Sequence, residues 1–545
     1  MAWLRDTSRS VSLEIGAGVA MMLTLLPAHA AKIDTGSPDF SLHWDTTVQL
    51  STAFRLKSQN PLLISDLNED DGDRNFNTGH ISDRLDILSE LDLDYKRDYG
   101  LRISGAGWYD PKYLEHNDND SPTTANNESV AYNQFNSEAQ RLHGRHAEVL
   151  DAFVYANGHV GDMASNVRLG RHSLLYGESL FFGNNGIAGG QSPIDAIKLL
   201  SVPNSQFKEI IRPVDQLSGQ LQVLSNVAIG AYYQFEWEKT RIPSAGSYFS
   251  GADILDGGER FLLGPVDPTT RQAPAWQHVA DQDAKNSGQG GVQVRWRPEI
   301  VDVELGFYAI RYNDKTPQGY FYAGPPGVGT YQLAYAEGVR AYGMSFSTEV
   351  GDANVAGEFS TRDNAPLVSD PVIVTSGTPD NNHNPGYAVG KTAHGQLSTI
   401  YIAKPTMFFD NATFLGEIAW NRRLSVTKNP QAVAINSTRD AWALRLIFEP
   451  AWFQVKPGLD LSAPIGLGWS GHGASSAVTQ FNAGGAKGGD LSLGLKGTYE
   501  QTWRFGLNYT HYLGAAGLGL VDTHFTFKQS LADRDFVSLS VQRSF

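Results

Sequence analysis

Apolar and polar residues alternate along the segment 40–56. Its even positions read Phe, Leu, Trp, Thr, Val, Leu, Thr, Phe and Leu, whereas its odd positions are mainly polar. Because successive side chains of an extended strand point to opposite faces, this period of two predicts one strand with an apolar face and a polar face. Strands of soluble sheets usually have about 3–10 residues, so this length favours a strand that spans a membrane.

The same alternation recurs along the rest of the chain, mostly in neighbouring pairs. The further predicted strands are 85–95, 99–109, 147–157, 165–172, 215–224, 227–237, 289–297, 301–312, 338–350, 354–362, 393–404, 412–421, 439–448, 452–463, 489–499, 502–513 and 535–545. The total is about 18, within a range of roughly 16–20, and an even number is required if both barrel ends face the periplasm. The run Val521–Lys528 also reads as a strand, and we assign it to a hairpin in the last outer loop.

The connections between these strands alternate in length. Short turns are predicted at 96–98, 225–226, 298–300, 351–353, 449–451 and 500–501. Long polar loops are predicted at 57–82, 110–146, 173–214, 238–288, 313–337, 363–392 and 470–488. Short periplasmic turns and long extracellular loops are typical of outer-membrane proteins. We therefore expect an all-β, antiparallel, up-and-down transmembrane β-barrel in the outer membrane of a Gram-negative bacterium.

The two ends of the chain carry export and assembly signals. Two arginines precede an apolar run over 11–26, and small residues at 28 and 30 suit a cleavage site. Residues 1–30 are therefore predicted to be a cleaved signal peptide, and 31–545 to be the barrel. The last strand alternates apolar and polar residues and ends on Phe545. This ending resembles the signal read by the barrel-assembly machinery, which is an expected partner.

Composition narrows the other partners. The chain has 58 acidic and 43 basic residues, and its net charge of −15 argues against binding to nucleic acid. It has no cysteine, which excludes disulfides and thiolate chemistry. Beyond the signal no run of about 18 apolar residues occurs, so no transmembrane helix is expected. The partners expected of such a barrel are outer-membrane lipid, lipopolysaccharide and a small-molecule substrate.

Several segments resemble a known family. They read VRLGRHSLLYGES from position 167, QSPIDAIKLLSVPNSQFKEIIRPVDQLSGQLQV from 191, AEGVRAYGMSFSTEVGDANVAGEFSTRDNAPL from 336, and DRDFVSLSVQRSF at the end. In these segments the chain resembles the proteobacterial domain-of-unknown-function 1302 family. It departs from the family at Ser-Pro-Ile-Asp in 192–195 and at His172, where glutamine is more usual. The resemblance implies an outer-membrane location and the uptake of hydrophobic or aromatic compounds.

The loop 173–214 is the best candidate for a functional segment. It has 42 residues and is rich in glycine and proline, and loops of this length in a compact fold are usually functional or disordered. We expect it to fold into the barrel as a constriction. The charged candidates on or near the path are Arg171, Glu178, Asp195, Lys198, Lys208, Glu209 and Arg212. Charged rings set the selectivity of such pores, but these charges would equally serve to pin the loop to the wall.

The leading hypothesis for function is a passive channel for hydrophobic or aromatic small molecules, gated by the loop 173–214. The candidate ligand contacts are Phe181, Phe182, Phe207, Tyr320, Phe321 and Tyr322, because apolar pockets suit such ligands. A general water-filled porin for small polar solutes is the first alternative. An outer-membrane lipid hydrolase is a weaker one, because the chain has no Gly-x-Ser-x-Gly motif. We expect no enzymatic activity, and a periplasmic acceptor protein is a further candidate partner.

The acidic stretch in the loop 57–82 suggests a calcium site. Asp66, Asn68, Asp70 and Asp73 carry oxygen ligands at short spacing, next to Gly72. The glycine stands one place too late for an EF-hand, and no closing glutamate follows in a helix. A solvated acidic loop is the alternative, and we expect no other cofactor.

Overall fold

Long antiparallel strands form the wall of this protein. The computed structural model describes residues 31–202, 206–325, 328–479, 481–483 and 485–545, so the predicted signal peptide 1–30 lies outside the described residues. The wall strands are β2 (Phe40–Arg55), β3 (Gly79–Tyr95), β4 (Tyr99–Tyr109), β5 (Arg145–Val160), β6 (Met163–His172), β7 (Val214–Leu224), β8 (Val227–Gln234), β11 (Gln289–Trp296), β12 (Val303–Tyr312), β15 (Val339–Val350), β16 (Ala353–Pro366), β18 (Val389–Ala403), β19 (Asn411–Lys428), β20 (Asp440–Lys456), β21 (Leu459–Ser462) with β22 (Ile465–His472), β23 (Gly489–Tyr499), β24 (Trp503–Leu513) and β27 (Phe536–Ser544).

The wall closes on itself. Each strand pairs with the next in the chain, and the last strand β27 pairs with both β24 and the first strand β2. Since β21 and β22 are two parts of one interrupted strand, the barrel has 18 strands, as the sequence predicts. The short strand β1 (Ala31–Ile33) adds to the start of β2. Closure satisfies the backbone hydrogen bonds that a membrane cannot satisfy.

The two faces of the wall differ as the alternation requires. On β8, Ile229 and Tyr233 are 43% and 44% exposed on the outside, whereas Ala228 and Tyr232 are 8% and 6% exposed on the inside. An apolar outer face with aromatic side chains is what lipid contact requires. The barrel therefore lies in the outer membrane of a Gram-negative bacterium.

One predicted turn is wrong. Strand β20 continues through the predicted turn at 449–451 to Lys456, and the chain reverses at 457–458, where Gly458 has a φ of +78°. Pro450 fits inside the strand because a proline φ is compatible with extended backbone, and its carbonyl accepts a hydrogen bond from the Ala463 nitrogen at 3.0 Å. The predicted strand 452–463 is thus divided between β20 and β21.

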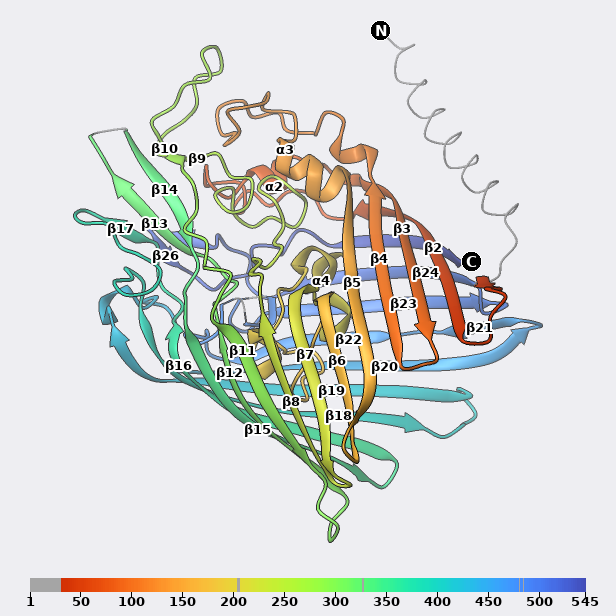
Figure 1. Cartoon of the computed structure of the whole chain (residues 1–545). Coiled ribbons are helices and arrows are strands. Elements are labelled where there is room, and N and C mark those ends of the chain that lie inside the picture. Colours follow the sequence, from red (N-terminus) through yellow and green to blue (C-terminus); the bar gives the residue numbers. More distant parts are fainter. Residues whose placement is uncertain (1–30, 203–205, 326–327, 480, 484) are drawn as a thin grey trace.

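The long loops gather at one end of the barrel, and the opposite end has short turns (Figure 1). Three loops together build a second sheet that the alternation does not predict. Its strands, in spatial order, are β17 (Val372–Val374), β13 (Gln318–Ala323), β14 (Val328–Ala334), β10 (Ala275–His278) and β9 (Arg260–Leu262). We call it the outer sheet. The last loop contains a hairpin, as predicted, formed by β25 (Leu520–Val521) and β26 (His524–Phe525), but the run Val521–Lys528 is not one strand, because it turns at 522–523.

The helices of the described chain are short and lie in the loops. They are α2 (Asp71–Arg74), η1 (Pro111–Tyr113), α3 (Ser137–Ala139), η2 (Gln140–Gly144), η3 (Ile187–Gly190), α4 (Ala196–Ser201), α5 (Phe207–Ile210), η4 (Pro430–Ala432) and η5 (Phe481–Ala483). Among the residues described, no helix has both the length and the apolar character to cross a membrane.

Candidate functional site

Residues 174–191, the first half of the predicted constriction loop, contact the inside of the wall far from where they leave it. We call this segment the strap. It follows β6, and its middle binds side chains on β16 and β19. Around the barrel, β19 is the eighth strand after β6; the strands between them are β7, β8, β11, β12, β15, β16 and β18. In a barrel of 18 strands the ninth strand would lie diametrically opposite. The strap therefore reaches from one side of the lumen to the other.

Two inward carboxylates hold the strap. Glu417 on β19 accepts hydrogen bonds from three successive backbone nitrogens, those of residues 180, 181 and 182, at 3.2, 2.5 and 2.8 Å. Glu358 on β16 accepts from the nitrogens of Glu178 at 3.0 Å and Ile187 at 2.6 Å. Both carboxyl groups are buried. Hydrogen bonds from backbone N–H groups to a charged acceptor are stronger than those between neutral groups.

The tip of the strap makes further specific contacts. The Asn185 amide nitrogen donates to the carbonyl of Trp420 at 3.2 Å, and its amide oxygen accepts from Asn421 at 3.2 Å. Arg362 on β16 donates to the carbonyls of Asn184 at 2.7 Å and Gly186 at 2.9 Å. The turn at 184–186 is therefore held from both sides.

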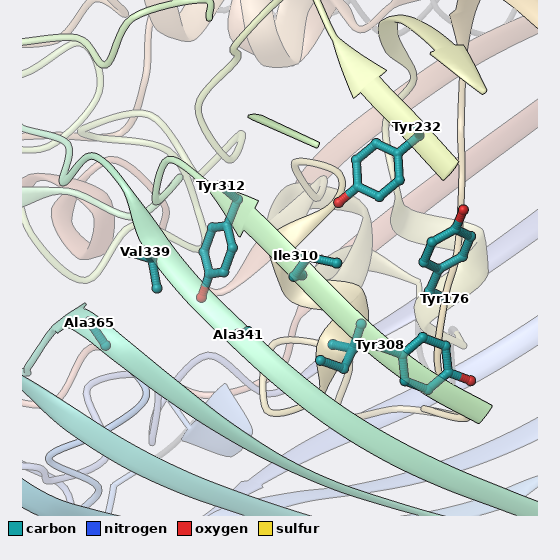
Figure 2. Packing of buried hydrophobic residues seen from close by; sticks show 9 residues of the cluster. Tyr176, Tyr232, Tyr308, Ile310, Tyr312, Val339, Ala341 and Ala365 are labelled. Atoms are coloured by element: carbon teal, nitrogen blue, oxygen red, sulfur yellow. The ribbon is translucent and has the colours of Figure 1, made fainter. Parts of the chain in front are cut away.

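An aromatic cluster fills the space between the strap and the wall (Figure 2). Tyr308 and Tyr312 point inward from β12, and Tyr232 points inward from β8. Tyr176 of the strap meets Tyr232 edge to face, with ring centroids 5.5 Å apart. Ile187 of the strap completes the cluster. Side chains therefore pack between this part of the strap and the wall strands β8 and β12.

Two arginines at the two ends of the loop, Arg171 and Arg212, bind carboxylates that follow β8. Arg171 pairs with Glu236 at 2.6 Å and Glu238 at 2.7 Å. Arg212 pairs with Glu238 at 2.8 Å, and burial beside Arg241 lowers the pKa of Arg212 below its ordinary value. Arg171 and Arg212 thus share a carboxylate, and the contacts agree with the pinning interpretation.

Three of the other charged candidates, Asp195, Lys198 and Glu209, contact one another around α4 and α5. Asp195 caps α4 by accepting from the Lys198 nitrogen at 2.9 Å, and Lys198 donates to the carbonyl of Glu209 at 2.8 Å. Lys208 is exposed. Glu178 belongs to the strap, where burial raises its pKa. Of the seven predicted pore residues, the structure brings only Glu178 into the strap itself, and the pore role of the seven stays a prediction.

The predicted aromatic contacts fall into two groups. Phe182 packs against Ala419 and Ala443 of the wall, with Phe181 beside it, and Phe207 packs under Ala188 of the strap. The other three belong to β13 of the outer sheet, in the stretch Tyr320, Phe321 and Tyr322. Tyr320 and Phe321 are buried there, so the outer sheet uses them for packing. Their contact with a ligand stays a prediction.

The four candidates for calcium binding all have partners within the chain. Asp73 pairs with Arg55 at 2.6 Å, and Asp70 pairs with Arg74. The Asn68 amide donates to the carbonyl of Leu262 at 3.0 Å, and Asp66 accepts from the Asn68 nitrogen at 2.8 Å. Among the described residues no group of three or more His, Cys, Asp or Glu side chains is arranged to hold a metal ion. The calcium hypothesis gains no support from these contacts.

Sequence reasoning missed the residues that hold the strap. Glu358 and Glu417 stand within predicted strands, at inward positions. A carboxylate at an inward position of a strand is ordinary in a polar lumen, so its type alone carries no signal. Each glutamate has mainly small or apolar neighbours in the sequence, AGEFS around Glu358 and LGEIA around Glu417. A single carboxylate in such surroundings is the signal that could have indicated a specific partner inside the barrel.

Comparison with known proteins gives one family and several solved structures. The family model described as "Protein of unknown function (DUF1302)" matches residues 12–545. No curated protein matches the chain. OccD3 (OpdP) of Pseudomonas aeruginosa is 10% identical, with 95% of each chain covered and a TM-score of 0.41. OccAB1 of Acinetobacter baumannii is 9% identical, with 95% of this chain and 99% of that chain covered and a TM-score of 0.42. Pseudomonas aeruginosa OpdK, solved with vanillate, is 12% identical, with 92% and 98% covered and a TM-score of 0.39.

Proposed function

The chain belongs to the DUF1302 family, and we propose that it is an outer-membrane channel for the passive uptake of small molecules. The strap is its constriction. The observation that carries the proposal is the pair Glu358 and Glu417, which accept five backbone N–H groups from a segment that reaches across the lumen. If the loop only filled the barrel, buried carboxylates would not be needed to hold it. Apolar packing would stabilise the loop at a lower desolvation cost.

Hydrophobic or aromatic molecules are the proposed cargo. The strap carries Phe181 and Phe182 at its tip and packs against inward tyrosines near its ends, such as Tyr232. Tyrosine combines a large apolar ring with a polar hydroxyl, and apolar surfaces with a few polar groups suit ligands of this kind. If the strap moves, a ring-bearing solute takes the place of these side chains.

A general porin for polar solutes is the second candidate. The inward positions near the periplasmic end are polar, as in Ser41, His43 and Asp45 of β2 and Glu90 and Asp92 of β3. A polar lumen favours water and polar solutes. Both candidate channels share this polar lining on the periplasmic side of the strap. The contacts of the solute with the strap therefore determine which class of solute passes.

The test is to release the strap and measure conductance and uptake. We expect the double variant Glu358→Ala with Glu417→Ala to raise single-channel conductance in planar bilayers severalfold. The matched control is Glu449→Ala, which removes an inward carboxylate of β20 that binds Lys496 and Ser462. Equal conductance of the double variant and the native protein, with the fold intact, would overturn the strap as a constriction.

Uptake separates the two cargo classes. Proteoliposomes containing the native protein should take up small aromatic acids faster than sugars of similar mass. Faster entry of the sugars would favour the general porin instead, and the strap would then act as a size filter.

A further inference from the structure

A row of charged side chains crosses the outside of the barrel near its loop end. Arg311 of β12 stands directly opposite Arg340 of β15, which stands opposite Asp363 of β16. Lys391 of β18 follows, with its ammonium group 3.4 Å from Asp363. The row continues on β19 with Arg422.

These side chains belong to the lipid-facing side of the wall. Arg311 is four residues from Phe307, and Arg340 is two residues from Tyr342, so each pair shares one strand face. Phe307 and Tyr342 are 42% and 54% exposed on the outside of the barrel. Arg340 and Lys391 are themselves 53% and 54% exposed.

The row stands at the height of lipid head groups. A strand rises about 3.3 Å per residue, so Arg340 lies roughly 7 Å beyond Tyr342 toward the loops. Exposed aromatic side chains mark the boundary between hydrocarbon and head groups in membrane barrels. Because the long loops mark the extracellular side, these head groups belong to the outer leaflet.

The row has more positive than negative charge. Asp363 serves both Arg340, at 2.6 Å, and Lys391, and Asp440 serves Arg422 at 3.2 Å. Arg311 forms no salt bridge with any residue in the part of the chain that the structure describes. Four cations therefore face two carboxylates, in a chain whose net charge is −15.

The pairing of Arg311 with Arg340 places two positive charges directly opposite each other. Like charges directly opposite each other on neighbouring strands destabilise a sheet. An anion between the two guanidinium groups would reduce that repulsion, and guanidinium binds phosphate with two parallel hydrogen bonds.

We propose that this row binds the phosphate groups of the phosphorylated glycolipid of the outer leaflet. Arg311, Arg340 and Lys391 contact the phosphates, and the outward faces of Phe307 and Tyr342 contact the acyl chains below. The proposal does not depend on the channel function, because it concerns the opposite side of the wall.

The same height on another part of the wall serves as a comparison. On β6 and β7 the outward residues are Arg171 and Asp215, which stand opposite each other. Arg171 is already paired with Glu236 and Glu238. This part of the rim has no excess of cations to offer a phosphate, in contrast to the row on β12–β19.

The experiment measures binding of lipid A that carries both phosphates to the full-length protein in detergent, by native mass spectrometry. The variant combines Arg311→Gln, Arg340→Gln and Lys391→Gln. We expect its affinity to fall about a hundredfold, since each basic residue near a charged lipid surface contributes roughly fivefold. The control combines Lys96→Gln, Arg97→Gln and Lys404→Gln, which removes the same charge from periplasmic turns.

The outcomes separate phosphate binding from general lipid binding. We call the triple variant of Arg311, Arg340 and Lys391 the rim variant. The site is supported if the control binds lipid A with native affinity, the rim variant binds it more weakly, and the native protein binds dephosphorylated lipid A more weakly. Unchanged affinity in the rim variant, or equal binding of dephosphorylated lipid A, overturns it. Because the substituted side chains are exposed, we expect the rim variant to fold, and resistance of the barrel to unfolding in cold SDS checks this. If it does not fold, Arg311→Gln alone, which breaks no salt bridge with a described residue, should lower the affinity about fivefold.

Discussion

Glu358 accepts a hydrogen bond from the backbone nitrogen of Ile187 at 2.6 Å, and the Ile187 side chain packs in the cluster formed by the inward tyrosines of β8 and β12. The same carboxylate accepts from Glu178, near the other end of the strap. One side chain of the wall thus ties the outgoing and the returning parts of the strap together.

Removal of this acceptor should loosen the strap. In Glu358→Ala two buried N–H groups lose their partner, and each unsatisfied group costs about 1–3 kcal/mol. We expect faster hydrogen exchange at residues 178–187, measured by mass spectrometry, with the wall strands unchanged. In Glu449→Ala the strap should exchange as in the native protein. Equal strap exchange in native protein and Glu358→Ala would contradict the assigned role.

Gly183 allows the two halves of the long loop to touch. A β-carbon at this position would overlap the ring of Phe207, on the returning half. Overpacking of this kind costs about 1–3 kcal/mol, so Gly183→Ala should lower the free energy of unfolding by that amount.

The measurement is urea unfolding in detergent, with Gly158→Ala as control. A β-carbon at Gly158 meets no atom within 4 Å, so this variant should behave as the native protein. In the double variant Gly183→Ala with Phe207→Ala, the free energy of unfolding should fall by less than the sum of the decreases in the two single variants. Removal of the ring also removes the overlap. Full additivity would show that the two residues do not meet.

The first and last strands are joined at their outer ends by buried charges. Arg55, at the end of β2, pairs with Asp73 at 2.6 Å and Asp533 at 3.1 Å, and Arg534 pairs with Asp73 at 3.3 Å. Loss of one partner from a buried ion pair costs about 3–5 kcal/mol, so Arg55→Met should destabilise the barrel by this amount. Thermal unfolding measures the change. Arg504→Met, at an exposed position of β24, should leave the midpoint unchanged.

The outer sheet should be most stable in mildly acidic solution. His278 of β10 stacks on Tyr331 of β14, with ring centroids 4.5 Å apart. Burial disfavours the charged imidazole, but its hydrogen bonds to Asp281 and the Gly258 carbonyl raise the pKa of His278 above 6.5. Burial also works against the Asp281 carboxylate, but its bonds from His278 and Leu333 hold its pKa below 3.8.

The signs of the two shifts define the pH window. A raised histidine pKa stabilises the folded sheet below 6.5, and this contribution is lost as the pH rises through the folded value. A lowered aspartate pKa stabilises it above 3.8, and this contribution is lost as the pH falls through the folded value. We therefore expect stronger hydrogen-exchange protection of β10 and β14 at about pH 5.5 than at about pH 8, after correction for intrinsic rates. His278→Gln should remove the difference, and its persistence would contradict the assignment.

The sequence by itself determined the wall. The alternation in segments such as 40–56 depends on each residue and its next neighbours, because the two faces of a strand meet different solvents over its whole length. Neighbouring strands in this barrel are also neighbours in the chain, so strand number and order follow from local patterns. The exception is Pro450, where a residue typical of turns is compatible with extended backbone.

Only the tertiary structure decided what fills the barrel. The partners of the strap, Glu358 and Glu417, are more than 170 residues away from the N–H groups that they accept. No local pattern links such positions. An inward carboxylate that binds a distant segment gives the same alternation pattern as an inward carboxylate that faces water. The outer sheet likewise joins three separate loops. Contacts between distant segments depend on the closed wall that brings them together, and they exist only once it has formed.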